Sequence, residues 1–425
     1  MPYSPVRVLR VKAWGRTVGA VAAGRRGGTA FQYDPAWLES GVELCPGTLP
    51  LLAGGKIHTF GPLPEVFRGL PPMLADAVPD SFGNALVDAH LAHLGWRPAD
   101  VTALDRLAYV GARGMGALEF EPATRTAEPP TPLVLAELVA EARAAVAGNL
   151  ASPEASRRAV SALLSVGTSA GGAQAKAVVA WDRASGELRA DRPGLPSSFE
   201  PWIVKFDGLA GALGASGRVE YAYCLMARDA GIDMAETDLL QESGRAHFMT
   251  RRFDRRDGGK LHLLSFAALA GLDFTLLRAH SHDQLFAQLE LLGLGGAERL
   301  QVFRRAAFNT LAANNDDHPK NTSFLSDQRG AWELAPAYDL TFAADPSRPW
   351  LAWRHLAVEG KYGGVSRRDL LTMADRFDVP DFKDALAEVE QAVSRWPRHA
   401  REAGLPPEAA QAVAAALAEA RAQAA

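Results

Sequence analysis

The sequence Asn315-Asp-Asp-His-Pro-Lys-Asn-Thr-Ser-Phe324 decides the fold class of this chain, together with the later motif Ala335-Pro-Ala-Tyr-Asp-Leu340. Asp316 and Asn321 stand five residues apart on one polar loop, and Asp339 follows eighteen residues after Asn321. An Asp and an Asn at this spacing, with a separate Asp after an apolar strand, can aim a hydroxyl group at a metal-bound phosphate. The two motifs therefore predict a phosphotransferase.

The polar loop has more than one interpretation. Asn, Asp and Pro dominate turns, so a solvated turn is the simplest alternative. Asp316 and Asn321 have the spacing of kinase catalytic loops, where the Asp orients the acceptor hydroxyl, whereas Asp317 lies one residue too close to Asn321. We therefore expect Asp316 to be the base. With His318, the loop also resembles that of lipid kinases that phosphorylate inositol headgroups, so it does not by itself separate protein kinases from lipid kinases.

The composition sets wider bounds. The chain has 425 residues, of which 48% are hydrophobic and 22% charged, which predicts two or three packed domains. Its net charge of −4 argues against a chain that coats nucleic acid by its own field. Only Cys45 and Cys224 are present, too few for a thiolate zinc site or a disulfide framework. With no secretion signal and no apolar run of about 18 residues, we expect a cytoplasmic protein without membrane contact.

The pattern along the chain predicts an α+β fold. Residues 6–14, 16–22 and 29–33 alternate like strands of a small antiparallel sheet. A Pro- and Thr-rich stretch at 121–131 is the clearest linker. Further strands are expected at 175–181, 202–206 and 248–253, and the pattern after residue 264 is mostly helical. We predict boundaries that give an N-terminal β-rich subdomain, the rest of an N-lobe and a helical C-lobe, at residues 1–125, 126–253 and 254–425.

The helices are predicted from apolar periodicity. We expect helices at 74–95, 100–107, 132–147, 153–164, 219–230, 283–292, 296–314, 367–377, 381–395 and 407–424.

A glycine-rich turn at 167–172 precedes the expected strand 175–181. Glycines and small residues let backbone N–H groups wrap phosphate oxygens. The turn is not a Walker A loop, because Lys176 lies four residues beyond the last Gly and no Ser or Thr follows it. An ordinary flexible turn is therefore the alternative. Ser169 lies within reach of a phosphate bound there, so it is a candidate for self-phosphorylation.

Lys205 lies in Pro-Trp-Ile-Val-Lys-Phe, among large apolar residues. A buried Lys without a partner is costly, so its ammonium must be paired or reach a polar cleft. A strand Lys followed by a helix that carries Glu220 matches the arrangement in which the Lys binds nucleotide phosphates and the Glu holds it in place. The alternative is an edge-strand Lys whose ammonium snorkels to solvent.

Together these motifs resemble the HipA family, the serine/threonine kinase toxins of bacterial toxin–antitoxin modules. The N-terminal part is similar through Trp14-Gly-Arg-Thr-Val-Gly19, Tyr33-Asp-Pro-Ala-Trp37 and Gly111-Ala-Arg-Gly-Met-Gly116. The remaining motifs that carry the resemblance are Ser169-Ala-Gly-Gly-Ala-Gln-Ala-Lys176, Trp202-Ile-Val-Lys-Phe206, Glu220-Tyr-Ala-Tyr-Cys-Leu-Met-Ala227, Arg252-Phe-Asp-Arg255, Asn315-Asp-Asp-His-Pro-Lys-Asn321 and Leu334-Ala-Pro-Ala-Tyr-Asp-Leu340.

The resemblance implies a role for each matching residue. It implies that Asp316 is the catalytic base, that Asn321 and Asp339 hold Mg²⁺, and that autophosphorylation of Ser169 shuts the kinase off. Asp254 would approach the ribose of ATP, and the main chain around Arg251 and Phe253 would hold its adenine. The residues expected beside the ATP phosphates are Ala170, Gly171, Gly172, Ala173, Gln174, Lys176, Lys205, His318 and Lys320, with Glu220 in support.

The resemblance also implies a two-lobed, protein-kinase-like fold with an additional N-terminal antiparallel β subdomain. Members of the family act on serines of proteins, characteristically aminoacyl-tRNA synthetases, and are neutralised by a small helix-turn-helix antitoxin that binds operator DNA. We therefore expect an ATP- and Mg²⁺-dependent protein serine/threonine kinase that reaches DNA only through its antitoxin. A phosphatidylinositol-kinase-like lipid kinase and a non-catalytic corepressor scaffold are the alternatives.

Overall fold

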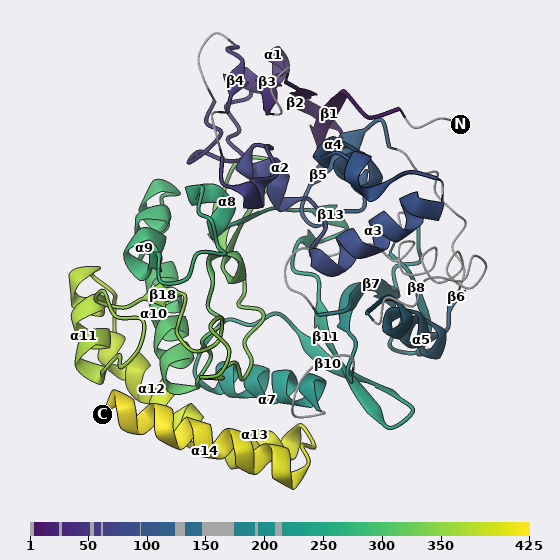
Figure 1. Ribbon diagram of the computed structural model, residues 1–425. Coiled ribbons are helices and arrows are strands. Elements are labelled where there is room, and N and C mark those ends of the chain that lie inside the picture. The colour runs from purple at the N-terminus through teal and green to yellow at the C-terminus, as the bar shows by residue number, and fades with distance from the viewer. Residues whose placement is uncertain are drawn as a thin grey trace. The chain divides into compact units, whose positions relative to one another are not determined.

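The computed structural model describes residues 4–24, 28–51, 55–60, 63–93, 95–123, 132–146, 174–191, 194–208 and 215–425. The chain forms two compact units, each assembled from separate segments (Figure 1). Unit 1 consists of residues 1–210, 240–264 and 326–331, and unit 2 of residues 211–239, 265–325 and 332–425. Three of the passages between the units lie within strands, namely β10 (Thr237–Glu242), β14 (His262–Ser265) and β16 (Ser323–Ser326).

A five-stranded sheet begins unit 1. Its strand order is β4-β3-β2-β1-β5, with antiparallel neighbours. Alternate residues of β1, including Leu9 and Val11, are buried, as expected for a strand with one face on a core. The predicted antiparallel N-terminal sheet is thus confirmed. The strands are β1 (Val8–Ala13), β2 (Arg16–Ala23), β3 (Thr29–Tyr33), β4 (His58–Thr59) and β5 (Leu118–Glu121).

A six-stranded sheet forms the second layer of unit 1, in the order β10-β11-β9-β7-β8-β6. Helices α3 (Ser81–His93) and α5 (Leu135–Val146) cover one face of it, because apolar residues such as Leu86 and Leu138 pack in one cluster with Val179 and Trp202 of the strands. The other strands of this sheet are β6 (Pro132–Leu133), β7 (Lys176–Trp181), β8 (Leu188–Ala190), β9 (Glu200–Lys205) and β11 (Arg245–Arg251).

The helix expected at 74–95 is interrupted in the structure. Helix α2 (Pro72–Asp76) ends early, because Pro79 lacks an N–H donor and disfavours a helical residue before it. A new helix, α3, follows Asp80, whose Oδ1 accepts a hydrogen bond from Gly83 N at 2.7 Å. The remaining elements of unit 1 are α1 (Pro35–Leu38), α4 (Ala103–Val110), the 3-10 turns Glu65–Phe67 and Pro98–Asp100, and the hairpin of β12 (Arg255–Arg256) and β13 (Gly259–Lys260).

Unit 2 is mostly helical, as the sequence predicts. Helix α10 (Gly296–Leu311) packs against α9, α11, α12 and α14, and α7 packs against α12 and α13 (Figure 1). Tyr223 of α7 donates a hydrogen bond from its hydroxyl to Ala312 O at 2.7 Å, which fixes α7 to the end of α10. The other helices are α7 (Ser216–Asp229), α8 (Phe266–Ala270), α9 (His282–Leu291), α11 (Arg367–Arg376), α12 (Phe382–Ser394), α13 (Trp396–Glu402) and α14 (Pro407–Ala424).

Helix α13 is absent from the sequence-based expectation because Pro397 is a helix breaker in most positions. Here it occupies the first turn of the helix, where the missing N–H donor costs nothing. Strands are few in unit 2. They include β15 (His280–Ser281) and β18 (Leu356–Ala357), which pair in parallel, and β17 (Trp332–Leu334).

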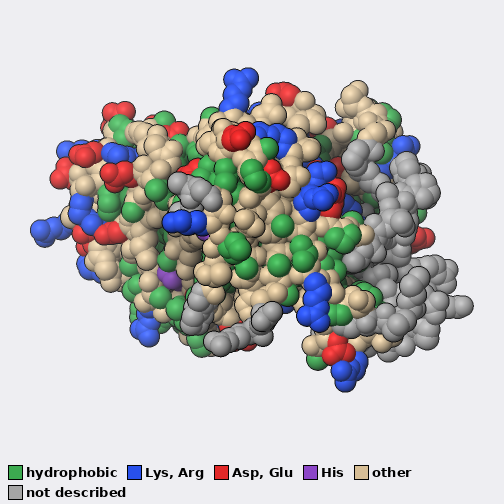
Figure 2. Space-filling model, turned by 90° about the horizontal axis from the view of Figure 1, so that it is seen from above, with side chains coloured by type: hydrophobic (Ala, Val, Ile, Leu, Met, Phe, Trp, Pro, Cys, Tyr) green, Lys and Arg blue, Asp and Glu red, His purple; other side chains and the backbone are tan. Residues whose placement is uncertain are grey.

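Charges of both signs are visible on one face of the molecule (Figure 2). On the face shown in Figure 2, Lys and Arg side chains are interspersed with Asp and Glu among the coloured residues. Both cysteines are buried thiols that form no disulfide. Within the described ranges, no helix combines the length and apolarity that crossing a membrane would require.

Candidate active site

The polar loop 315–321 follows the end of α10 in unit 2 and closes on itself. A short 3-10 turn, Pro319–Asn321, begins after His318, whose Nδ1 accepts a hydrogen bond from Lys320 N at 3.2 Å. Asn321 Nδ2 donates to the main-chain oxygen of Asp316 at 2.7 Å. The loop therefore brings together the Asp and Asn that the sequence spaces five residues apart.

The two adjacent carboxylates of the loop have different environments. Asp317 is buried, and it accepts hydrogen bonds from His355 N at 2.7 Å and Leu356 N at 3.3 Å. The side chain of Asp316 is 33% exposed, and its Oδ1 accepts a hydrogen bond from Trp350 Nε1 at 2.7 Å. Among the residues that the structure describes, no hydrogen bond reaches Asp316 Oδ2. Asp316 is thus the carboxylate with an oxygen available to a substrate hydroxyl.

A small cavity in unit 2 is lined by Asp316, Asn321 and Asp339 together. Asp339 has a φ of 54°, in the left-handed region that Asp tolerates better than most residues. The preceding Tyr338 donates a hydrogen bond from its hydroxyl to Lys320 O at 2.6 Å, which ties the Asp339 segment to the 3-10 turn. The three oxygen-bearing residues predicted from the two motifs therefore share one cavity.

Asn321 and Asp339 have the donor chemistry that Mg²⁺ prefers. The Asn321 amide uses its nitrogen in the bond to Asp316 O, which leaves the amide oxygen for a cation, and Asp339 supplies a carboxylate. In the described part of the chain, no group of three or more His, Cys, Asp or Glu residues could hold a metal ion. A pair of oxygen ligands suits a cation that is also bound by nucleotide phosphates and water.

His318 lies against the rings of Phe274, Trp350 and His355, at centroid distances of 5.6, 5.9 and 5.9 Å. Burial lowers the pKa of His318, and the nearby charge of Asp316 only partly opposes this. The imidazole is therefore neutral at neutral pH, so it offers one donor and one acceptor rather than a positive charge. Lys320 Nζ lies over the Phe274 ring, 5.3 Å from its centroid.

In unit 1, Lys176 of β7 and Lys205 of β9 are directly opposite each other in the antiparallel register. Both are buried. Lys176 Nζ forms an ion pair with Asp80 Oδ2 at 3.0 Å, whereas Lys205 Nζ lies over the Phe248 ring, 5.6 Å from its centroid. The ammonium of Lys176, expected beside phosphates, is thus matched by a buried carboxylate in this structure. Gln174, which precedes β7, is half-buried.

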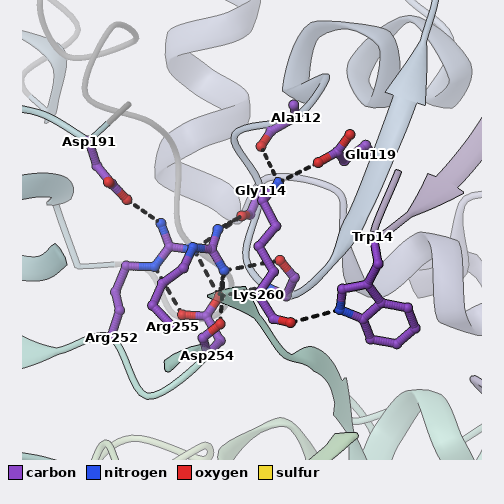
Figure 3. Close-up of polar contacts among 10 residues, drawn as sticks. Trp14, Ala112, Gly114, Glu119, Asp191, Arg252, Asp254, Arg255 and Lys260 are labelled. Atoms are coloured by element: carbon purple, nitrogen blue, oxygen red, sulfur yellow. Dashed lines mark hydrogen bonds and ion pairs between the residues drawn. The ribbon is translucent and has the colours of Figure 1, made fainter. Parts of the chain in front are cut away.

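The segment expected to hold the nucleoside forms a buried charge cluster (Figure 3). Asp254 is 0% exposed, and its carboxylate accepts hydrogen bonds from Arg252 Nη2 and Arg255 Nη1, each at 2.8 Å, and from Gly116 N at 2.6 Å. Burial alone would raise the pKa of Asp254, but the two guanidinium charges lower it below its usual value. The carboxylate oxygens of Asp254 accept from these protein donors, and a contact with the ribose of ATP stays a prediction.

The remaining candidates are distributed over both units. Arg251 is exposed and pairs with Glu200 at 2.9 Å, and Phe253 is half-buried. Glu220 is buried on α7 of unit 2, and its pairing with Lys205 stays a prediction. Two predicted segments lie outside the described residues. They are the helix expected at 153–164 and the glycine-rich turn with its candidate residues Ser169, Ala170, Gly171, Gly172 and Ala173.

Sequence reasoning missed Trp350 and Tyr338 as parts of this site. Tyr338 is adjacent to Asp339, so a hydroxyl beside a predicted ligand was a usable signal. No local signal identifies Trp350, which lies 34 residues after Asp316 and reaches it through tertiary structure.

Comparison with known proteins identifies the family. A family model described as the HipA-like C-terminal domain matches residues 168–424, and one described as the HipA N-terminal domain matches residues 9–121. The chain belongs to the HipA family. Because the first model alone covers more than half of the chain, the resemblance seen in the motifs is confirmed.

Two individual relatives agree with this assignment. One is Y4mE of Sinorhizobium fredii, which is described provisionally as a kinase. It is 29% identical over 372 residues, and the match covers 82% of this HipA-family chain and 81% of Y4mE. The solved structure of HipA from Shewanella oneidensis MR-1, in a complex with HipB and operator DNA, has a TM-score of 0.66 at 16% identity and covers 98% of this chain and 96% of its own. At that identity the likeness shows the fold, and the predicted α+β fold class is confirmed.

Proposed function

We propose that this HipA-family chain is an ATP- and Mg²⁺-dependent protein serine/threonine kinase. The observation that carries the proposal is the cavity that Asp316, Asn321 and Asp339 line together. Phosphoryl transfer needs little covalent chemistry from the protein, so a base, metal ligands and a nucleotide-binding lysine are sufficient. The family motif around Lys205 of β9 supports this residue as that lysine.

In the proposed reaction, Asp316 Oδ2 accepts the proton of a serine or threonine hydroxyl as its oxygen attacks the γ-phosphorus of ATP. The bond between that phosphorus and the bridging oxygen breaks, and ADP leaves. When bound, Mg²⁺ would neutralise charge on the nucleotide phosphates, held by Asn321 and Asp339. His318, neutral and buried next to the base, can take part as a hydrogen-bond donor without adding charge.

We extend the proposal to regulation and partners on the strength of family membership. Autophosphorylation of Ser169 would limit the activity, and a serine of a bacterial protein, such as an aminoacyl-tRNA synthetase, would be the acceptor. A small helix-turn-helix antitoxin would bind the chain and carry it to operator DNA. The Shewanella oneidensis structure, in which HipA occurs with HipB and DNA, supports this choice of partner.

The test is transfer from γ-labelled ATP, with the chain itself, a mixture of synthetases and phosphoinositide vesicles as separate acceptors. We expect label on protein serines, and a loss of about 10²- to 10⁴-fold in Asp316→Asn, because the proton acceptor is removed. Asp375→Asn, which changes an exposed carboxylate on α11, is the matched control and should retain full activity.

Each alternative function predicts its own result in this assay. Label on lipid alone would identify a lipid kinase. A second measurement, the thermal shift with Mg-ATP, separates a catalytic chain from a scaffold, because a ligand that binds only the folded state raises its melting temperature. Absence of both transfer and shift would overturn the proposal in favour of a non-catalytic scaffold.

A further inference from the structure

We infer that Trp350 is a positioning residue that fixes the carboxylate of Asp316 and thereby selects the oxygen that accepts the substrate proton. The inference rests on the proposed function and deepens it. Its basis is the hydrogen bond from Trp350 Nε1 to Asp316 Oδ1 at 2.7 Å, a short distance for an indole donor. An indole N–H can only donate, so Oδ1 of Asp316 is the acceptor in this contact.

The indole is the only hydrogen-bond donor to this carboxylate among the described residues. His318 Nε2 lies 3.9 Å from Asp316 Oδ1, which is too far for a hydrogen bond. A carboxylate without a donor rotates about its Cβ–Cγ bond and presents either oxygen. With Oδ1 held by Trp350, Oδ2 is the oxygen that remains for a substrate hydroxyl.

Both partners are held independently of the bond between them. On the loop side, Asn321 Nδ2 donates to Asp316 O at 2.7 Å, which fixes the main chain of the base. On the indole side, the main-chain oxygen of Trp350 is 3.0 Å from His355 Nε2, and the two rings lie 4.2 Å apart between centroids. The indole is therefore half-buried in a fixed position rather than resting on the surface.

The residues on either side of Asp316 fasten the same two segments together. Asn315 Nδ2 donates to Leu351 O at 2.8 Å, and Asp317 accepts from the main-chain N–H of His355 at 2.7 Å. Three consecutive loop residues thus each bind the segment that carries Trp350. Loss of the indole N–H would leave the outer two attachments in place, so a variant at Trp350 should keep its fold while its base becomes free to rotate.

The predicted effect is on orientation and not on ATP binding. A hydrogen bond to a carboxylate does not make it a stronger base, so the gain comes from holding the accepting oxygen in line with the hydroxyl. A misplacement of about 1 Å in a reacting group can cost about 10²-fold in rate. We therefore expect the loss of Trp350 to lower kcat and to change the KM for ATP only a little.

The experiment compares Trp350→Phe with Trp353→Phe. Trp353 is a half-exposed tryptophan of the same segment and, among the described hydrogen bonds, makes none to Asp316. In Trp350→Phe we expect kcat to fall about 10- to 100-fold with the KM for ATP within about twofold, whereas Trp353→Phe should match the unaltered chain. In an Asp316→Asn background, Trp350→Phe should add no further loss, because its effect acts through the base.

A readout independent of activity accompanies the kinetics. In the ¹⁵N-labelled protein, the indole resonance that disappears in Trp350→Phe should move in Asp316→Asn and stay in place in Asp375→Asn. Equal kcat in Trp350→Phe and Trp353→Phe, or an undiminished effect of Trp350→Phe in the Asp316→Asn background, would overturn the inference while leaving the kinase intact. If the unaltered chain transfers no phosphate, the proposed function fails and the positioning role fails with it, whatever the indole resonance reports about the contact.

Discussion

Arg354 and Asp317 form a buried ion pair, with 3.4 Å between Nη2 and Oδ2, directly beside the proposed catalytic base. Burial lowers the pKa of Arg354, and the charge of Asp317 partly restores it. The loop therefore contains two consecutive carboxylates in different environments. Asp317 is enclosed by a guanidinium and two main-chain N–H groups, whereas Asp316 keeps one oxygen open.

Asp317→Asn is expected to destabilise unit 2 strongly. The substitution leaves the Arg354 charge buried without its partner, and breaking a buried pair in this way costs about 3–5 kcal/mol. Urea unfolding followed by tryptophan fluorescence gives the free energy of unfolding. Asp316→Asn is the matched comparison. It should cost only about 1 kcal/mol, because it weakens one partly exposed hydrogen bond. Equal losses in the two variants would contradict this division of roles.

The stability of unit 2 is expected to fall with decreasing pH because of His282. Burial lowers the pKa of His282 to about 4, and the nearby charge of Asp317 opposes this only partly. In the unfolded chain the pKa is about 6.5, so the unfolded state takes up the proton first as the pH falls. Stability is therefore fully present above about pH 6.5 and is lost progressively down to about pH 4, by about 3 kcal/mol in total.

The control for this prediction is His282→Asn. The His282 Nδ1 lies 3.1 Å from Ala357 O, and the Asn amide nitrogen can donate to the same oxygen without titrating. Urea unfolding between pH 7.5 and pH 4.5 should show a shallower loss of stability in this variant. An unchanged slope would assign the pH dependence to other groups.

The local parts of the fold are predictable from the sequence because they depend on neighbouring residues. Alternation in β1 and the apolar periodicity of α10 are properties of short segments, so their bounds differ from the predicted ones by only a few residues. The spacing of Asp316 and Asn321 is also a property of a short segment, so it could be read from the sequence. A closed loop needs only those few residues to bring the pair together.

Contacts between residues far apart in the chain could not be predicted from the sequence. Lys176 pairs with Asp80, 96 residues earlier in the chain, and nothing near either residue indicates the other. In the run of charges at 251–256, basic residues alternate with Phe and Asp, which by sequence alone favours a link between two lobes over a basic patch. In the structure Arg252 and Asp254 are buried, because Asp191 and Gly116 from distant segments complete the cluster. Such pairings require the tertiary fold.

Asp254→Asn is expected to destabilise unit 1 rather than to weaken ATP binding directly. The carboxylate neutralises Arg255 and part of the charge of Arg252, so its removal leaves buried guanidinium charge and should cost about 3–5 kcal/mol. Arg251→Ala, which removes an exposed pair with Glu200, should cost less than about 1 kcal/mol. Urea unfolding measures both. ATP affinity is measured by calorimetric titration of each variant at a temperature where both are folded. We expect both variants to bind ATP with the same affinity as the unaltered chain. Weaker ATP binding by Asp254→Asn at unchanged stability would instead support the ribose contact implied by the family.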